Sequence, residues 1–163
     1  MVKGTDHLGT RRELLRQAVV VAGVPCACLG SAKAPCCKLP DAPPAAVRID
    51  RDVVRLDLDR MPELRRTGSA VKVIDESRNL YLLIAHPEKH QFVALDQKCT
   101  HYGGPLTYVH ERRLLHCTCW GHARFGLDGR ILFWPNSKPG QPLRVHRLAR
   151  AGNILEIRVD APV

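Results

Sequence analysis

Two short clusters of cysteine and histidine constrain this chain more than any other feature of its sequence. The first is the stretch CTHYGGPL, which contains Cys99 and His101, and the second is CTCWGH, which contains Cys119 and His122. Each cluster follows a segment with the composition of a β-strand, so two loops at the same end of a sheet would bring the four side chains together. Two thiolates and two imidazoles suit either a tetrahedral zinc ion or a two-iron cluster with mixed ligation.

The segments around these clusters predict an all-β fold. Short antiparallel strands at regular spacing favour a β-sandwich or a small barrel. Beyond the N-terminal segment, residues 60–67 are the one stretch that indicates a helix. The expected strands are 71–74, 80–85, 91–95, 113–116, 130–133, 143–148 and 154–159, with turns at 75–79, 128–129 and 152–153.

The composition excludes several function classes. The 163 residues have room for one domain, with or without a small tail, and the net charge of +9 favours acidic partners or anionic lipid. No uncharged apolar run reaches about 18 residues, which excludes a polytopic membrane protein. Basic residues are dispersed and aromatic residues are few, which argues against a nucleic-acid surface. The sequence contains no Ser-His-Asp arrangement, phosphate loop or dinucleotide fingerprint.

The N-terminal segment has the features of an export signal. Arg11 and Arg12 precede a leucine pair, and residues 17–32 carry no charge. This pattern resembles a twin-arginine signal, with an amphipathic helix as the alternative. The uncharged run of 16 residues, at about 1.5 Å per residue, is shorter than a hydrocarbon core of about 30 Å. We expect residues 1–38 to be a signal or membrane-anchor helix, with membrane association through residues 14–32 and export to the periplasmic or outer face of the membrane.

Residues 39–46 are rich in Pro and Ala and predict an extended linker without a core face, so the domain itself would span 47–163. Four cysteines precede this linker, and their spacing fits no familiar metal site. These four are Cys26, Cys28, Cys36 and Cys37. We expect them to have no role in the mature domain, and the alternatives are a disulfide, lipidation or metal transfer.

The two Cys/His clusters together resemble the Rieske family. The pattern is Cys99-x-His101, then 17 residues, then Cys119-x-x-His122. Residues 103–106 are similar to the first cluster loop of the family, and residues 123–130 are similar to the strand and hairpin that follow its second loop. Residues 135–142 are similar to the proline-rich loop that covers the cluster.

The resemblance implies a Rieske-type antiparallel β-sandwich with a small cluster-binding subdomain at about 97–135. It also implies one [2Fe–2S] cluster per chain, with one iron on the sulfurs of Cys99 and Cys119 and the other on the nitrogens of His101 and His122. Two neutral imidazoles in place of two thiolates make the cluster less negative. Its potential therefore rises from about −400 mV to roughly −150 to +300 mV.

A fifth candidate, Cys117, lies two residues before Cys119. If Cys117 were the ligand, the next histidine would stand five residues later, whereas the family places it three residues after the cysteine. We therefore choose Cys119 as the ligand and expect Cys117 to be a half-buried small thiol without a role.

The chain departs from respiratory members of the family at positions that affect the potential. Gly104 and Gly121 stand where those members pair two cysteines in a disulfide, and Arg124 and Phe125 stand where they carry hydroxyl donors. The loss of two donors lowers the potential, so we expect a value below that of quinol-oxidising members. The charge of Arg124 would act in the opposite direction.

Other residues near the clusters have ordinary interpretations. We expect Trp120 and Trp134 to shield the cluster from water. The adjacent pair 112–113 is expected to be a solvated hairpin end, with docking of an acidic electron acceptor as the alternative. The remaining histidines are expected to be surface or turn residues: His86, His90, His110, His116 and His146.

These features predict an electron-transfer protein that performs no substrate chemistry by itself. The N-terminal segment, linker and single domain resemble iron–sulfur subunits of exported quinol-oxidising complexes of the cytochrome bc type, and small subunits of arsenite-oxidase-like enzymes. A Rieske-type ferredoxin of a dioxygenase system is the alternative, and a zinc-stabilised binding module is the second alternative. The expected partners are a redox protein such as a cytochrome, and quinol. An oxygenase α-subunit is not expected at this length.

Overall fold

The protein is described by a computed structural model that covers residues 39–137 and 139–159, and within these ranges the fold is all-β, as the sequence predicts. This part of the chain contains eleven strands and no α-helix. The strands are β1 Val47–Asp50, β2 Val53–Asp57, β3 Ser69–Asp75, β4 Leu80–Glu88, β5 Gln91–Asp96, β6 Leu106–Val109, β7 Leu114–Cys117, β8 Arg124–Gly126, β9 Ile131–Phe133, β10 Val145–Ala151 and β11 Ile154–Arg158. Short 3-10 helices lie between them: η2 Pro44–Ala46, η3 Leu58–Arg60, η4 Pro62–Arg65, η5 Glu76–Arg78 and η6 His110–Arg112.

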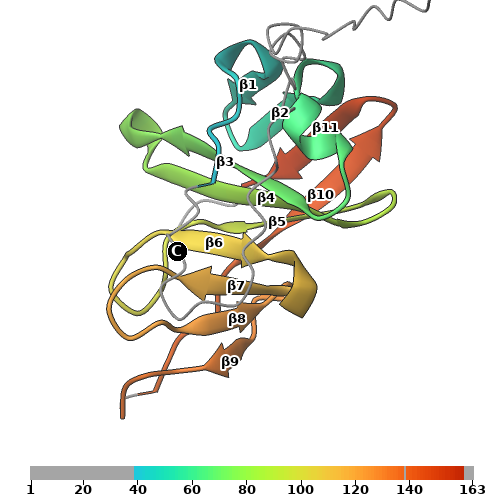
Figure 1. The fold of residues 1–163 in the computed structure, drawn as a ribbon. Helices are drawn as coiled ribbons and strands as arrows, with labels where there is room; N and C mark the ends of the chain where they lie inside the picture. The colour runs from blue at the N-terminus through green and yellow to red at the C-terminus, as the bar shows by residue number, and fades with distance from the viewer. Residues whose placement is uncertain (1–38, 138, 160–163) are drawn as a thin grey trace, which may run out of the picture. The chain divides into compact units, whose positions relative to one another are not determined.

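The strands form two antiparallel sheets. The larger has the order β1-β2-β11-β10-β5-β4-β3, and the smaller has the order β6-β7-β8-β9. Strand β10 joins the two halves of the larger sheet, because Val145 and His146 pair with β5 whereas residues 147–151 pair with β11. Figure 1 shows three layers, with β1, β2 and β11 at the top, β3 to β5 in the middle and β6 to β9 at the bottom.

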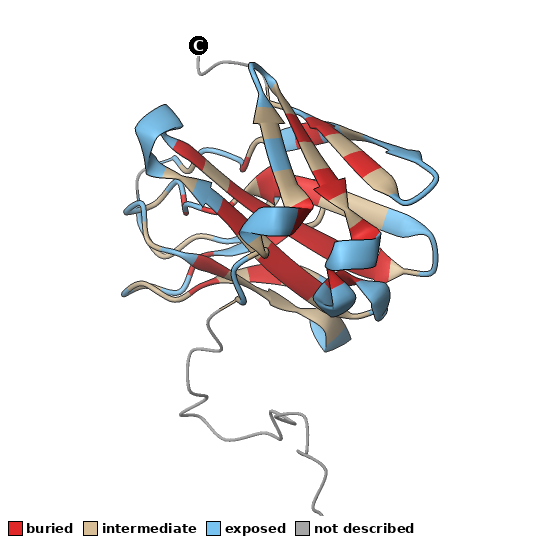
Figure 2. Cartoon of the chain, turned by 90° about the horizontal axis from the view of Figure 1, so that it is seen from above, coloured by how far each residue is buried: buried red, intermediate tan, exposed pale blue. Residues whose placement is uncertain are grey.

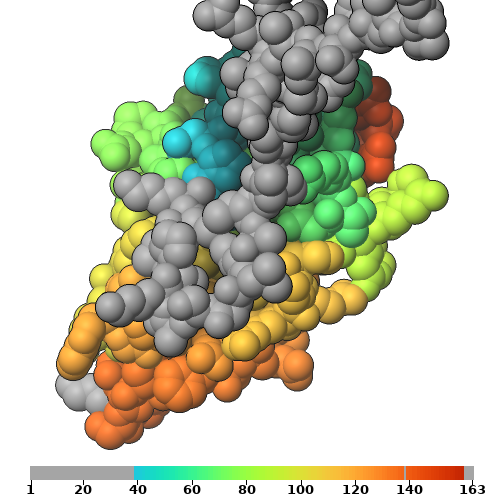
Figure 3. All heavy atoms as spheres, viewed as in Figure 1, coloured from blue at the N-terminus to red at the C-terminus, as the bar shows by residue number. Residues whose placement is uncertain are grey.

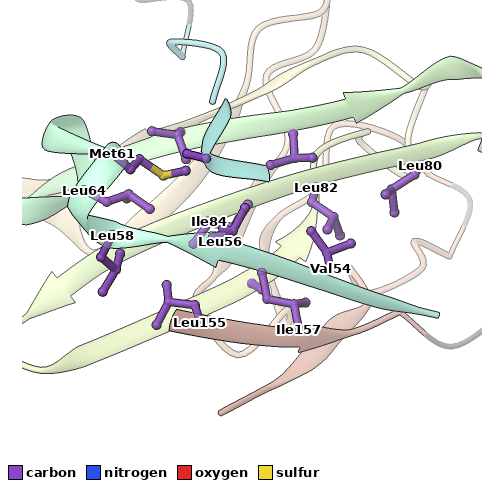
Figure 4. Close-up of a cluster of buried hydrophobic side chains, with 14 residues drawn as sticks. Val54, Leu56, Leu58, Met61, Leu64, Leu80, Leu82, Ile84, Leu155 and Ile157 are labelled. Atoms are coloured by element: carbon purple, nitrogen blue, oxygen red, sulfur yellow. The ribbon is translucent and has the colours of Figure 1, made fainter. Parts of the chain in front are cut away.

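The two halves of the larger sheet face each other across an aliphatic core (Figure 4). Alternate residues of each strand point inwards, because successive side chains on a strand point to opposite faces. Burial of one such side chain stabilises the fold by about 1.5–3 kcal/mol. The core includes Val54, Leu56, Met61, Leu64, Val71, Val73, Leu82, Ile84, Leu155 and Ile157.

Strand β4 is buried on both faces, which explains the uninterrupted apolar run LYLLIA in its sequence. Leu82 and Ile84 belong to the first core, whereas Leu83 and Ala85 belong to a second core that also contains Phe125 of β8. The second core therefore packs the middle layer against the four-stranded sheet. Figure 2 shows the buried segments along the strands and the exposed ones gathered in the connecting turns.

The sequence patterns missed β1, β2 and β6 and overstated one helix. The β1–β2 turn contains Arg51 at φ +49°, without the glycine or asparagine that signals a tight hairpin. The expected helix at 60–67 is instead a 3-10 turn over Pro62–Arg65. Pro62 begins this turn and cannot donate a backbone hydrogen bond, and Gly68 at φ +88° follows it. The stretch is therefore too short for an α-helix.

The segment 39–46 contacts the domain, which differs from the expected linker without a core face. Lys72 donates its backbone N–H to the carbonyl of Pro40 at 2.9 Å, and Ala42 donates to the carbonyl of Lys72 at 2.8 Å. Ala46 is buried in the first core. These contacts cover part of the outer edge of β3, which would otherwise present unpaired backbone groups.

The expected signal or anchor helix and its four cysteines, in residues 1–38, lie outside the described residues. The boundaries of the signal or anchor segment at 1–38, of the linker at 39–46 and of the domain at 47–163 stay predictions. None of the helices in the described ranges has the length and apolar character that a membrane span requires.

Because β4 is buried on both faces, we expect truncation of its core side chains to lower the stability of the protein. Leu82→Ala leaves a cavity in the first core and should lower the free energy of unfolding by about 2–5 kcal/mol, as measured by urea denaturation. Ile74→Ala, on the partly exposed end of β3, is the control and should cost about 0.5 kcal/mol or less. A loss below about 1 kcal/mol for Leu82→Ala would contradict the position of β4.

Candidate metal centre

The β6–β7 hairpin holds the two Cys/His loops side by side. Its ladder pairs Leu106 with Cys117, so the first loop enters β6 and the second leaves β7 at the same end. Thr118 connects the two loops by hydrogen bonds. Its backbone N–H and its hydroxyl both donate to the carbonyl of Pro105 at 3.0 Å. Strand pairing therefore brings cysteines 18 and 20 residues apart in the sequence to one end of the sheet.

The first loop is tightly wound around its cysteine. The backbone N–H of Cys99 donates to the carbonyl of Gly104, and that of Gly103 donates to the carbonyl of Cys99, both at 2.8 Å. Gly103 lies at φ +69°, a conformation that favours glycine. The backbone N–H of His101 points at the Cys99 sulfur, with 3.4 Å between N and Sγ.

The second loop turns back within four residues. The backbone N–H of His122 donates to the carbonyl of Cys119 at 3.2 Å, and that of Cys117 donates to the carbonyl of Ala123 at 2.9 Å. Gly121 and His122 both have positive φ, at +102° and +54°. The turn leaves Cys119 half-buried and His122 exposed.

Three of the four predicted ligands converge. Ligand atoms of Cys99, His101 and Cys119 all lie within 4.8 Å of one another. His101 Nδ1 is 3.7 Å from Cys119 Sγ. This group joins the two loops and contains Cys119 but not Cys117, which supports the choice between them.

The fourth predicted ligand, His122, is not part of this group. Its Nδ1 faces the carbonyl oxygen of Cys117 at 3.4 Å, and its ring lies 5.3 Å from the ring of His116. His122 is nevertheless three residues from Cys119 on the same turn. Its backbone therefore lies on the second loop, whereas its ring faces Cys117 and His116 and stays outside the converged group.

The environment of His101 fits a bound metal group. Its ring packs against Tyr102 at 3.8 Å and edge-on against Trp134 at 5.3 Å, measured between ring centroids. Its Nε2 is buried without a hydrogen-bond partner. Two sulfurs and a nitrogen with an unsatisfied imidazole suit the mixed ligation of a [2Fe–2S] cluster, and also suit zinc.

The two tryptophans differ in their surroundings. Trp134 is half-buried between His101 and Phe125, as expected of a residue that shields the site. Trp120 is 88% exposed, so the expectation that it shields the site is wrong. The turn at Gly121 directs the chain back towards β8 and leaves the preceding indole in solvent. Tyr102, beside His101, is also 64% exposed.

Burial affects the cysteines of the site. It raises the pKa of the Cys99 thiol, while the backbone N–H of His101 lowers it. Burial also raises the pKa of Cys117, which is fully buried and not half-buried as expected. Metal binding therefore has to displace a proton from Cys99 at neutral pH.

Two histidines expected at the surface are buried. His86 Nδ1 lies 2.8 Å from the carbonyl oxygen of Leu64, and its ring stacks on Phe92. His146 Nε2 lies 2.8 Å from a carboxylate oxygen of Asp96. Each has a partner from a distant part of the chain, which sequence spacing could not show. His116 is half-buried beside His122.

The arginine pair lies away from the loops. Arg112 ends η6 and Arg113 follows it at φ +51°, at the end of the β6–β7 hairpin opposite the Cys/His loops. Arg113 pairs with Glu88. The position of Arg112 and Arg113 therefore does not support the alternative in which they dock an electron acceptor next to the second loop.

Gly104 and Gly121, which stand where respiratory members of the family carry cysteines, lie against the candidate ligands. A Cβ added to Gly104 would stand 2.5 Å from Cys119 Cβ. One added to Gly121 would stand 2.8 Å from His101 Cε1 and 3.0 Å from Pro135 Cγ. The sequence shows only that these two positions lack cysteines. The structure adds that a side chain at either position would come too close to Cys119 or His101.

Gly121→Ala should therefore impair metal binding. The added Cβ meets His101 and Pro135, so we expect bound iron and acid-labile sulfide to fall below about half of the wild-type content. Gly152→Ala is the matched control, because Gly152 also has positive φ, at +61°, but nothing lies within 4 Å of an added Cβ. That variant should lose about 1 kcal/mol of stability and keep its metal. Equal metal contents would contradict the role of Gly121.

Comparison with known proteins agrees with this geometry. The family model of the Rieske [2Fe-2S] domain matches residues 54–150, which is more than half of the chain. No curated protein matches the sequence. Among solved structures, the chain is similar to the cyanobacterial plasma membrane Rieske protein PetC3 from Synechocystis PCC 6803, with 19% identity, a TM-score of 0.44, and coverage of 55% of this chain and 86% of that one. On the match of the family model, the chain belongs to the Rieske [2Fe–2S] domain family.

Proposed function

We propose that this protein transfers electrons through one [2Fe–2S] cluster, held through sulfur by Cys99 and Cys119 and through nitrogen by His101 and His122. The observation that carries the proposal is the convergence of Cys99, His101 and Cys119 within 4.8 Å, at the loop end of a Rieske domain. When bound, the cluster accepts and releases one electron at a time. The chain's own residues hold it, bury its sulfur side and donate hydrogen bonds to the ligand sulfurs.

A hydrogen-bond donor beside Cys99 favours the reduced state. The backbone N–H of His101 donates to its sulfur, with 3.4 Å between N and Sγ. Donors to a ligand sulfur stabilise added negative charge, so they raise the reduction potential. The tight loop makes this possible, because its backbone turns around Cys99 and directs amides inwards.

The two residues at the start of β8 add no hydroxyl donor to the site. Phe125 is fully buried in the second core and has no hydroxyl to donate. Arg124 is exposed, with its guanidinium 5.5 Å from the ring centroid of Phe133, so solvent screens its charge. A potential below that of quinol-oxidising relatives therefore remains our expectation.

The physiological complex is proposed from the sequence. The twin-arginine-like segment and the linker support an exported or membrane-associated iron–sulfur subunit of a quinol-oxidising complex, acting at the periplasmic or outer face of the membrane. The partners would then be quinol and a redox protein such as a cytochrome. The glycines at 104 and 121 support the alternative, a Rieske-type ferredoxin of a dioxygenase system.

The exposed aromatic side chains next to the ligands offer a docking surface for the redox partner. Trp120 is adjacent to Cys119, and Tyr102 is adjacent to His101. Large exposed aromatic groups are enriched at protein interfaces, where they become buried. In Figure 3 the subdomain that carries the loops lies at the lower end of the coloured, described part of the chain, in yellow to orange.

Metal and sulfide analysis of the purified chain tests the cofactor. We expect about two iron and two acid-labile sulfide per chain, a visible absorption band, and an electron spin resonance signal on reduction. Redox titration should give a midpoint below about +200 mV, within the range of Rieske centres. Stoichiometric zinc without iron would instead establish the structural module and overturn the electron carrier.

Trp120→Ala tests the docking surface. Loss of the exposed indole should slow electron transfer to a soluble c-type cytochrome by about threefold or more, while the midpoint potential stays unchanged. Ile74→Ala removes a partly exposed apolar side chain of β3 and serves as the control with an unchanged rate. Equal rates for wild type and Trp120→Ala would exclude the indole from the docking surface.

A further inference from the structure

A cavity of about 680 Å³ opens at one end of the first core, between the two halves of the larger sheet. Its lining comes from the β1–β2 turn, the start of β4, the end of β5, the start of β10 and the residue after β11. Val54 and Leu80 belong both to the core and to the cavity wall. Figure 4 shows them at the end of the core away from Leu58, Met61 and Leu64. Small-molecule sites typically have volumes of about 300–1,000 Å³, so this cavity has the size of a ligand site.

The inner wall of the cavity is apolar. Val54 and Leu80 are buried, and Ile49 and Val159 are half-buried. Tyr81 adds a half-buried aromatic ring. Carbon atoms of this kind gain free energy when a ligand displaces water from them. The wall therefore suits the apolar part of a ligand.

The mouth of the cavity, formed by its exposed residues, is positively charged. Arg51, Arg78 and Lys98 are exposed and line it. Arg78 pairs with Asp75, and Lys98 Nζ lies 3.3 Å from the centroid of the Tyr81 ring. In the part of the chain that the structure describes, neither Arg51 nor Lys98 pairs with a carboxylate. Two cations at the mouth are therefore free to pair with an incoming anion.

The acidic residues of the lining offset this charge only in part. His146 is buried, and its Nε2 lies 2.8 Å from a carboxylate oxygen of Asp96, so Asp96 already has a partner. Asp52 is exposed at the mouth. Against these two carboxylates, the described lining carries four cationic side chains: Arg51, Arg78, Lys98 and Arg144. The cavity thus has an excess of positive charge above an apolar wall.

We propose that this cavity binds a small amphiphilic anion, namely a carboxylate on a medium-length apolar chain. The apolar chain would contact Val54 and Leu80, and the carboxylate would lie at the mouth, where Arg51 and Lys98 stand. A charged group that stays at the mouth keeps part of its hydration, so it avoids the cost of full burial. The inference does not depend on the proposed function, because none of the four candidate metal ligands is among the described residues that line the cavity.

Calorimetric titration of the full chain with octanoate tests the proposal. We expect one saturable site per chain. Butanoate should bind at least about tenfold more weakly, because it buries four fewer methylene groups. Octanol has the same chain length without the charge, and it should also bind more weakly than octanoate.

Substitutions at the mouth locate the site. Arg51→Gln and Lys98→Gln should each raise the Kd for octanoate about threefold, and the double variant about tenfold. Asp52→Asn removes a negative charge and should lower the Kd. Because Lys98 precedes Cys99, Arg51→Gln is the variant that leaves the Cys/His loops unaltered. All three residues are exposed, so the thermal midpoint without ligand should stay at the wild-type value.

Lys89→Gln is the matched control. Lys89 is exposed and lines a smaller cavity of about 320 Å³ that Leu58 and Leu64 border, at the other end of the first core. Its substitution removes the same charge from the protein, so an unchanged Kd would show that the local cations, and not the net charge, bind the carboxylate.

Several results would overturn the amphiphile site. These are the absence of saturable octanoate binding, equal Kd values for octanoate and butanoate or for octanoate and octanol, and an unchanged Kd in the double variant. A Kd raised by Lys89→Gln but not by the double variant would assign octanoate to the smaller cavity, which also overturns the proposal. Iron and sulfide analysis tests the proposed function separately, so failure of one leaves the other standing.

Discussion

The pairing of β6 with β7 is the interaction on which the candidate metal centre depends. The ladder sets Leu106 opposite Cys117, so the loops that precede and follow the hairpin leave from the same end. Thr118 then ties the second loop to Pro105 of the first. A change of register by one residue would turn alternate side chains to the other face and separate the two cysteines that converge.

The hairpin packs on the centre of the domain through the second core. Strand β4 contributes Leu82 to one core and Leu83 to the other, so the middle layer supports both the remainder of the larger sheet and the four-stranded sheet. Phe125 extends the second core to the half-buried Trp134, which packs on His101. The site is thus buried on its sulfur side and presents Trp120 and His122 to solvent. This division suits a centre that holds its charge near the core and exchanges electrons at its surface.

Much of the fold and of the site was predictable from local patterns. The apolar run of β4, the turn at Gly152 and the Cys/His spacing are local features, and strand formation and metal-ligand chemistry depend on them directly. The β1–β2 hairpin was missed because Arg51 replaces the usual turn residue. The buried positions of His86 and His146 were missed because their partners, Leu64 and Asp96, lie 22 and 50 residues away.

By itself, the sequence determined the all-β class, the candidate ligands and the family, because residue types at short spacing carry that information. Tertiary structure alone brought Cys119, and not Cys117, into the group with Cys99 and His101, and buried Cys117 fully in the second core. It also decided that Trp120 faces solvent. These outcomes depend on which strand faces which, and strand pairing joins residues that no local pattern relates.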